Sequence, residues 1–218
     1  MRWPERRDSR PEGFAEQTMA LNFYERCWTL NEAACPCDVH FVSFLQERVL
    51  AHKSIFHFGT GAHHVVALEN ARLGLGNSIL GITCSKQEYA SYMDLVSTDS
   101  SLAVSYKAIY ADAYTLSSGV LPEFDIVTLF HLGEYWNGRG DGMHGNPSAE
   151  APLNDQGLFD LMWSRTREGG LLLFYRGSAG WVRTEPILER AIASGRIRDA
   201  GSHRTLSIYR KVGAGEVS

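Results

Sequence analysis

Residues 54–68, "SIFHFGTGAHHVVAL", decide how the chain folds. The apolar run 54–58 predicts a short buried strand, and apolar residues at helical spacing follow from residue 62. Between them lies the Gly-Thr-Gly turn 59–61. Glycine has no Cβ atom, so such a turn lets the backbone approach a ligand closely, and the start of the next helix offers free N–H groups to an anion or carboxylate. The stretch therefore predicts a ligand-binding loop after the first strand of an α/β sheet.

Outward from this stretch, predicted strands and helices alternate. We expect two helices before it, a helix directly after it, and then strands and helices in turn, closed by a hairpin of two short strands. This order indicates a mostly parallel sheet with right-handed crossovers and an antiparallel edge. Such sheets bind ligands beyond the carboxyl ends of their strands, so function is expected in the loops after residues 58, 82, 111 and 130. The predicted helices are 19–34, 38–53, 62–74, 85–96, 153–168 and 184–194, and the later strands are 78–82, 103–111, 124–132, 171–176, 196–201 and 204–211.

Composition narrows the class of protein. The chain has 218 residues, a net charge of −4 and 44% hydrophobic residues, with a pI near 6.1. An acidic balance argues against a nucleic-acid partner, and the longest apolar runs are too short to span a membrane. We expect a cytoplasmic protein. Its four cysteines, which include the closely spaced pair Cys35 and Cys37, are expected to be free thiols.

Three further motifs stand in register with the glycine loop. Asp112 comes just past the third predicted strand, Phe124-Asp125 opens the fourth, and Gly169-Gly170 precedes the fifth. With these motifs, residues 38–211 resemble the class I S-adenosylmethionine-dependent methyltransferases. The resemblance implies a Rossmann-like, doubly wound, seven-stranded sheet whose last hairpin inserts its final strand antiparallel.

The resemblance also implies roles for individual residues. Gly59 and Gly61, with Thr60 and His63 of the same loop, would bind the methionine part of S-adenosylmethionine, and Asp112 with Ala113 would face the adenine ring. Two usual acidic anchors are replaced, because His57 stands at the acid of the first strand and Thr83 ends the second. Gln87 or Glu88 could hold the ribose instead. His63 takes the place of the third glycine.

The loop after the fourth strand would border the methyl acceptor. His131 is the candidate general base, since a histidine pKa is easily tuned near neutrality, although it could equally be bonded within the pocket wall. Glu134 could hold a cationic acceptor or assist deprotonation, or face solvent. Tyr135 and Trp136 could form an aromatic wall or simply pack.

A metal site is a weaker alternative. His63, His64, His131 and His144 could converge at one end of the sheet. Adjacent residues at the start of a helix point about 100° apart, so His63 and His64 rarely share one ion, and no HxH or HxxxH pair exists. We therefore predict no metal ligands, and expect His57 to be a hydrogen-bonded core residue.

These features predict an S-adenosylmethionine-dependent methyltransferase that methylates oxygen or nitrogen of a small molecule. The alternative is a protein of the same fold that binds a ligand or does other chemistry. Residues 1–37 are expected to form a partly disordered arm and helix that cap the pocket, residues 38–218 the catalytic domain, and the glycine-rich loop 137–150 a lid. The sequence allows a homodimer but does not indicate one.

Overall fold

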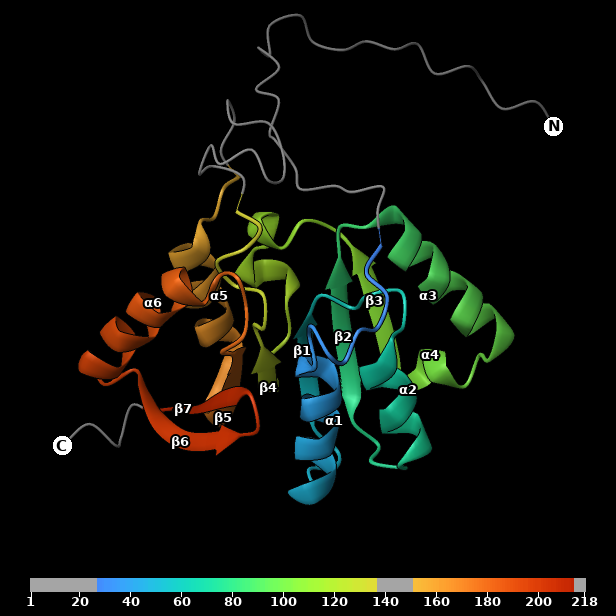
Figure 1. Ribbon diagram of the computed structural model, residues 1–218, viewed down its shortest axis with the longest axis horizontal. Coiled ribbons are helices and arrows are strands. Elements are labelled where there is room, and N and C mark those ends of the chain that lie inside the picture. Colours follow the sequence, from blue (N-terminus) through green and yellow to red (C-terminus); the bar gives the residue numbers. More distant parts are fainter. Residues whose placement is uncertain (1–26, 137–150, 214–218) are drawn as a thin grey trace, which may run out of the picture.

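The computed structural model describes residues 27–136 and 151–213. The predicted disorder of residues 1–17, the first part of the predicted helix 19–34, and the predicted lid 137–150 lie outside these ranges. Within them, strands and helices alternate along the chain (Figure 1). The helices are α1 (Cys37–Glu47), α2 (Val65–Arg72), α3 (Lys86–Thr98), α4 (Leu102–Ser105), α5 (Asp155–Arg165) and α6 (Trp181–Ala193), with single 3-10 turns η1 (Ala113–Thr115) and η2 (Ser118–Val120). The strands are β1 (Ser54–Phe58), β2 (Ser78–Thr83), β3 (Tyr106–Tyr110), β4 (Phe124–Thr128), β5 (Thr166–Tyr175), β6 (Ile197–His203) and β7 (Leu206–Lys211).

The strands form one sheet in the order β3-β2-β1-β4-β5-β7-β6. Neighbouring strands among β1 to β5 are parallel to each other, whereas β7 is antiparallel to both β5 and β6. The chain works outward from β1 to β3 and then returns to the other side of β1 with β4. The sequence-based prediction of a doubly wound, mostly parallel seven-stranded sheet with a C-terminal antiparallel hairpin is confirmed.

Helices cover both faces of this sheet (Figure 1). On one face, apolar residues of α1, α2 and α3 pack against alternate residues of the central strands, and on the other face α5 and α6 do the same. Because successive residues of a strand point to opposite faces, Ile55 of β1 joins the first cluster and Phe56 the second. Both are completely buried. The continuous apolar runs of the central strands thus reflect a sheet with two covered faces.

The N-terminal side differs most from the prediction. Residues 27–36 form no helix, so the predicted helix 19–34 is wrong where the structure describes it. Instead, Trp28 makes backbone hydrogen bonds to residues near the carboxyl ends of the strands. Its N–H donates to Glu88 Oε1 at 2.9 Å, and its carbonyl accepts from the Ala62 N–H at 2.8 Å. The predicted helix 38–53 ends at Glu47, and Val49 beyond it has φ 52° and is 77% exposed.

Several boundaries also shift. The helix predicted from residue 62 begins at Val65, because His64 adopts a left-handed conformation with φ 45°. β3 begins three residues later than predicted, after the one-turn helix α4, and β4 ends at Thr128. β5 begins before the double glycine, which therefore lies within the strand and does not end a helix. A Cβ atom on Gly170 would lie 2.9 Å from the Asp125 carbonyl oxygen, so glycine there lets β5 lie close to β4.

Among the residues that the structure describes, no helix combines the length and apolar character needed to cross a membrane.

Candidate active site

A cavity of about 360 Å³ lies beyond the carboxyl ends of β1, β2, β3 and β4. All four loops in which function was predicted contribute to its lining, and residues of the segment 28–35 line it as well. This is the place where strand order reverses, which is where open α/β sheets bind their ligands.

The loop after β1 forms one part of the lining with its glycines. Gly59 has φ 87° and Gly61 φ 55°, conformations that glycine adopts without strain. A Cβ atom on Gly61 would overlap the imidazole ring of His63. Gly59, Gly61 and His63 all line the cavity. Thr60 lies elsewhere: it is buried and does not line the cavity, and its methyl group packs where a Cβ atom of Gly81 would be. The structure thus brings Gly59, Gly61 and His63 to the cavity but not Thr60.

Glu88 is the acidic residue in the first turn of α3, which follows β2. It is 3% exposed and lines the cavity; its Oε2 accepts from the Thr83 hydroxyl at 2.6 Å, and its Oε1 accepts from the Trp28 N–H. Burial raises the pKa of Glu88, which its hydrogen bonds oppose. Gln87 is exposed on α3 and does not line the cavity. Of the two residues predicted to hold a ribose, the structure therefore brings only Glu88 to the site, where Thr83 also lines the cavity.

Asp112 follows β3 and is held rigidly. Its Oδ1 accepts from the Tyr114 N–H at 3.0 Å, which fixes the carboxyl group at the start of η1. Asp112 and Ala113 are both buried and both line the cavity. Both residues therefore lie at the cavity end of the third strand, and their contact with an adenine ring stays a prediction.

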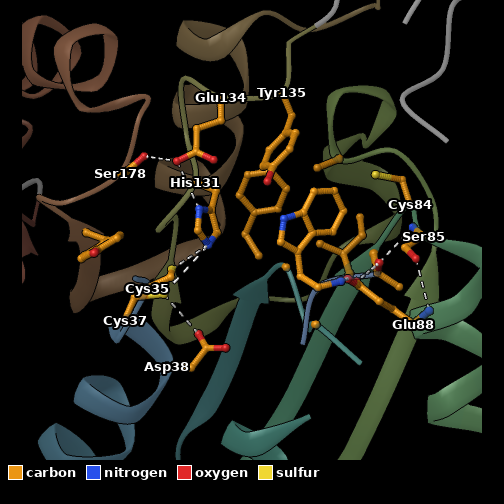
Figure 2. A pocket seen from close by; sticks show the side chains of 18 of the residues that line it. Cys35, Cys37, Asp38, Cys84, Ser85, Glu88, His131, Glu134, Tyr135 and Ser178 are labelled. Atoms are coloured by element: carbon orange, nitrogen blue, oxygen red, sulfur yellow. Dashed lines mark hydrogen bonds and ion pairs between the residues drawn. The ribbon is translucent and has the colours of Figure 1, made fainter. Parts of the chain in front are cut away.

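The loop after β4 supplies the opposite part of the lining. His131 Nδ1 lies 3.3 Å from Glu134 Oε1, which also accepts from the Ser178 hydroxyl (Figure 2). Tyr135 lines the cavity, and its ring meets that of His131 edge-on with centroids 6.2 Å apart. Trp136 packs against the core and is not part of the lining.

Two thiols face the same histidine. Cys35 Sγ and Cys37 Sγ are 3.4 Å apart, and each lies 3.9 Å from His131 Nε2 (Figure 2). A hydrogen bond from the Cys37 thiol lowers the pKa of Cys35 to about 4, although burial opposes it, and the His131 cation adds to the effect. Burial lowers the pKa of His131, but its bonds to Cys35 and Glu134 outweigh burial and raise that pKa to about 10. These neighbours favour the protonated imidazole, which cannot accept a proton. The role of His131 as a general base stays a prediction.

Asp38 lies beneath these groups at the start of α1. Its Oδ1 is 3.6 Å from His57 Nε2, and its Oδ2 is 3.7 Å from His63 Nε2. Burial raises the pKa of Asp38 to about 7. His57 Nδ1 lies 2.9 Å from the Thr128 hydroxyl in the core, as expected for a hydrogen-bonded structural histidine.

The adjacent histidines point to different places. His63 lines the cavity, whereas His64 is buried, with Nδ1 2.8 Å from the Tyr106 hydroxyl and Nε2 3.2 Å from the Glu88 carbonyl. The two side chains diverge as predicted, but not through helical spacing, because both residues precede α2 and His64 has a left-handed backbone. His144 lies outside the described residues.

Comparison with solved structures identifies the fold. The ribosomal protein L11 methylase of Lactobacillus delbrueckii subsp. bulgaricus matches 85% of this chain over 81% of its own, with a TM-score of 0.54 and 16% identity. A methyltransferase of Pyrococcus furiosus matches 81% of this chain over 83% of its own, with a TM-score of 0.52 and 16% identity. The strand order of this chain and its antiparallel β7, inserted between β5 and β6, match that fold. This is the class I S-adenosylmethionine-dependent methyltransferase fold.

Another methyltransferase of this fold has been solved with ligands. The 16S rRNA N2 G1207 methyltransferase RsmC of T. thermophilus, in complex with AdoMet and guanosine, matches 84% of this chain with a TM-score of 0.52 and 17% identity. The present chain spans 43% of the RsmC chain. No protein-family model and no curated protein matches the sequence. The comparisons thus establish the methyltransferase fold.

Sequence reasoning missed Cys35, Cys37 and Asp38 as residues of the site. The cysteine pair was visible, and the expectation that the thiols are free is confirmed. Its partner was not visible, because Cys37 and His131 are 94 positions apart and the cysteines come before the first strand. The available signal in the sequence was the close spacing of Cys35 and Cys37 just before the predicted helix 38–53.

Proposed function

We propose that the protein is a methyltransferase that uses S-adenosylmethionine to methylate a small molecule. One observation carries the proposal: a single cavity joins the glycine loop after β1, the acids after β2 and β3, and the polar loop after β4. When bound, S-adenosylmethionine supplies an electrophilic methyl group on a positively charged sulfur. The first three loops would hold it, and the fourth would hold the acceptor.

The donor set suits that cofactor. Gly59 and Gly61 line the cavity with backbone alone, and a side chain on Gly61 would displace the His63 ring that lines it as well. Glu88 and Asp112 offer carboxylate oxygens, which can accept hydrogen bonds from ribose hydroxyls and from an adenine amino group. Negative charge lining the cavity also favours a cationic sulfonium ligand.

The remaining residues orient the acceptor and shield it. Tyr135 and Trp28 both line the cavity. Their rings meet edge-on with centroids 6.0 Å apart. Displacement at a methyl group depends mainly on alignment of the acceptor and exclusion of water, so such walls would contribute directly. The segment supports the predicted role of the N-terminal region as a cap.

A small acceptor fits the charge of the chain. The net charge is −4, whereas polyanion-binding surfaces are normally basic. The competing function is a ligand-binding protein of the same fold without methyl transfer, which the replacement of the usual acids by His57 and Thr83 favours.

Labelled methyl transfer tests the proposal. Purified protein is incubated with methyl-labelled S-adenosylmethionine and, separately, the small-molecule, RNA and protein fractions of a cell extract. We expect label in the small-molecule fraction. Label confined to RNA or protein would contradict the acceptor class, and binding of the cofactor without transfer to any fraction would favour the ligand-binding alternative.

A further inference from the structure

Cys35, Cys37 and His131 converge from distant parts of the chain at the edge of the cavity. Each offers one ligand atom, and the three atoms lie within 4.8 Å of one another (Figure 2). All three residues line the cavity. Two thiolates and an imidazole form a donor set that zinc uses in catalytic sites, where the fourth position stays open.

The spacing of the donor atoms fits one ion. With Zn–S bonds near 2.3 Å and a Zn–N bond near 2.05 Å, a tetrahedral site needs about 3.8 Å between sulfurs and about 3.6 Å between sulfur and nitrogen. The corresponding distances here are 3.4 Å between the sulfurs and 3.9 Å from each sulfur to His131 Nε2. These distances differ from the ideal by about 0.3 to 0.4 Å, so side-chain adjustments alone would centre an ion among them.

The histidine is also oriented as a metal ligand. Its Nε2 faces the sulfurs, while its Nδ1 faces Glu134 Oε1 at 3.3 Å. The Ser178 hydroxyl in turn donates to the same carboxylate oxygen. Histidines that bind metal usually donate their second N–H to a carboxylate, which fixes the ring and its tautomer. This outer contact is independent of the cysteines and points to the same site.

We propose that Cys35, Cys37 and His131 bind one zinc-type divalent cation, and that its remaining position, toward the cavity, takes the sulfur of a thiol acceptor. The acceptor half of this inference rests on the proposed methyltransferase function. It replaces the expected oxygen or nitrogen acceptor by sulfur.

The chemistry follows from the place of the ion. A thiol that coordinates zinc is deprotonated outright, so its proton passes to solvent and no protein base is needed. The coordinated sulfur then forms a bond to the methyl carbon, while the bond from that carbon to the sulfonium sulfur breaks. The electron pair of the broken bond stays on the departing sulfur and neutralises its charge. The methylated thioether binds zinc less strongly than the thiolate and can leave.

Metal binding is tested first. Protein freed of metal under reducing, anaerobic conditions is dialysed against Zn²⁺ or Co²⁺ and analysed by elemental mass spectrometry. We expect about one ion per chain, and for Co²⁺ an intense near-ultraviolet sulfur-to-metal band. Cys35→Ser and His131→Gln should lose the ion, while Cys84→Ser should keep it, because Cys84 lines the same cavity without joining the cluster. Thermal unfolding checks that the variants fold.

A second variant separates a site from an incidental cluster. Glu134→Gln keeps all three ligands but alters the outer contact, so we expect the Zn²⁺ affinity to fall about 10- to 100-fold. No bound ion in the wild-type protein, or equal loss of the ion in Cys84→Ser and Cys35→Ser, would overturn the metal site.

Small thiols test the open position. Adding a simple thiol such as 2-mercaptoethanol to the Co²⁺ protein should intensify and shift the sulfur-to-metal band, and an unchanged spectrum would overturn the thiol half. Titration with S-adenosylmethionine is run separately. Metal binding without cofactor binding would support the metal site and contradict the methyltransferase proposal. Cofactor binding without metal binding would support the methyltransferase proposal and contradict the metal site.

Discussion

Replacing Glu88 by Gln tests which group holds the cofactor at the second strand. Glutamine has the shape of glutamate, and its amide can serve both existing contacts: the oxygen can still accept from the Trp28 N–H, and the NH₂ can donate to Thr83 Oγ1. The variant should therefore keep the local structure while it removes the negative charge.

The magnitude follows from the bonds that the charge would make. Hydrogen bonds to a charged group contribute roughly 1.5–3 kcal/mol, and 1.4 kcal/mol corresponds to about tenfold in affinity. If Glu88 accepts the ribose hydroxyls, Glu88→Gln should weaken binding of S-adenosylmethionine about 10- to 100-fold.

Isothermal titration calorimetry measures this change, with Gln87→Ala as the matched control. Gln87 is the neighbouring residue, is exposed, and does not line the cavity, so its variant should bind like the wild type. Unchanged affinity in Glu88→Gln would refute the reasoning, as would an equal loss in Gln87→Ala. Thermal unfolding of both variants shows whether a loss reflects the site or the fold.

Three further changes test the loops and the core. Gly61→Ala should lower cofactor affinity, because its Cβ would displace the neighbouring imidazole; Gly74→Ala imposes a similar positive φ in open space and should leave binding unchanged. Gly180→Ala should lower the free energy of unfolding by about 1–3 kcal/mol in denaturant titrations, because its Cβ would meet backbone atoms, whereas Gly119→Ala has open space and should be near neutral. Burial lowers the pKa of His64 to about 4. As the pH falls below about 6.5, this histidine therefore becomes protonated in the unfolded chain before it does in the folded protein. The free energy of unfolding should fall by at most about 3 kcal/mol between pH 6.5 and pH 4. His64→Asn, which tolerates the left-handed backbone, should remove that part of the slope.

Each of these expectations has a contradicting result. Equal affinities for the two loop variants would show that the Gly61 turn does not bear on the cofactor. Equal unfolding free energies for Gly180→Ala and Gly119→Ala would refute the close backbone packing. An unchanged pH slope in His64→Asn would mean that this histidine does not carry the acid sensitivity.

The fold was predictable because its strands are short apolar runs with glycine or capping residues at their ends. Ser85, for example, was expected to begin a helix, and its hydroxyl does accept from the Glu88 N–H at the start of α3. The segment 27–36 could not be predicted in the same way. Its composition suits a helix, but the backbone groups of Trp28 bond to residues 62 and 88, which are distant in sequence.

The site divides along the same line. The loops after β1 to β4 could be placed from the sequence, since parallel strands bring their carboxyl ends together. The side-chain directions within these loops could not, and this is why Thr60 and Gln87 were predicted as site residues although neither lines the cavity. The convergence of Cys35 and Cys37 on His131 depends on how α1 packs on the sheet, and no spacing in the sequence records it.

Titration of the wild-type protein with S-adenosylmethionine and with its demethylated product tests the central claim most directly. We expect saturable binding of both ligands at one site, with each ligand competing against the other. No detectable heat with either ligand at millimolar concentration, from protein shown to be folded, would contradict it.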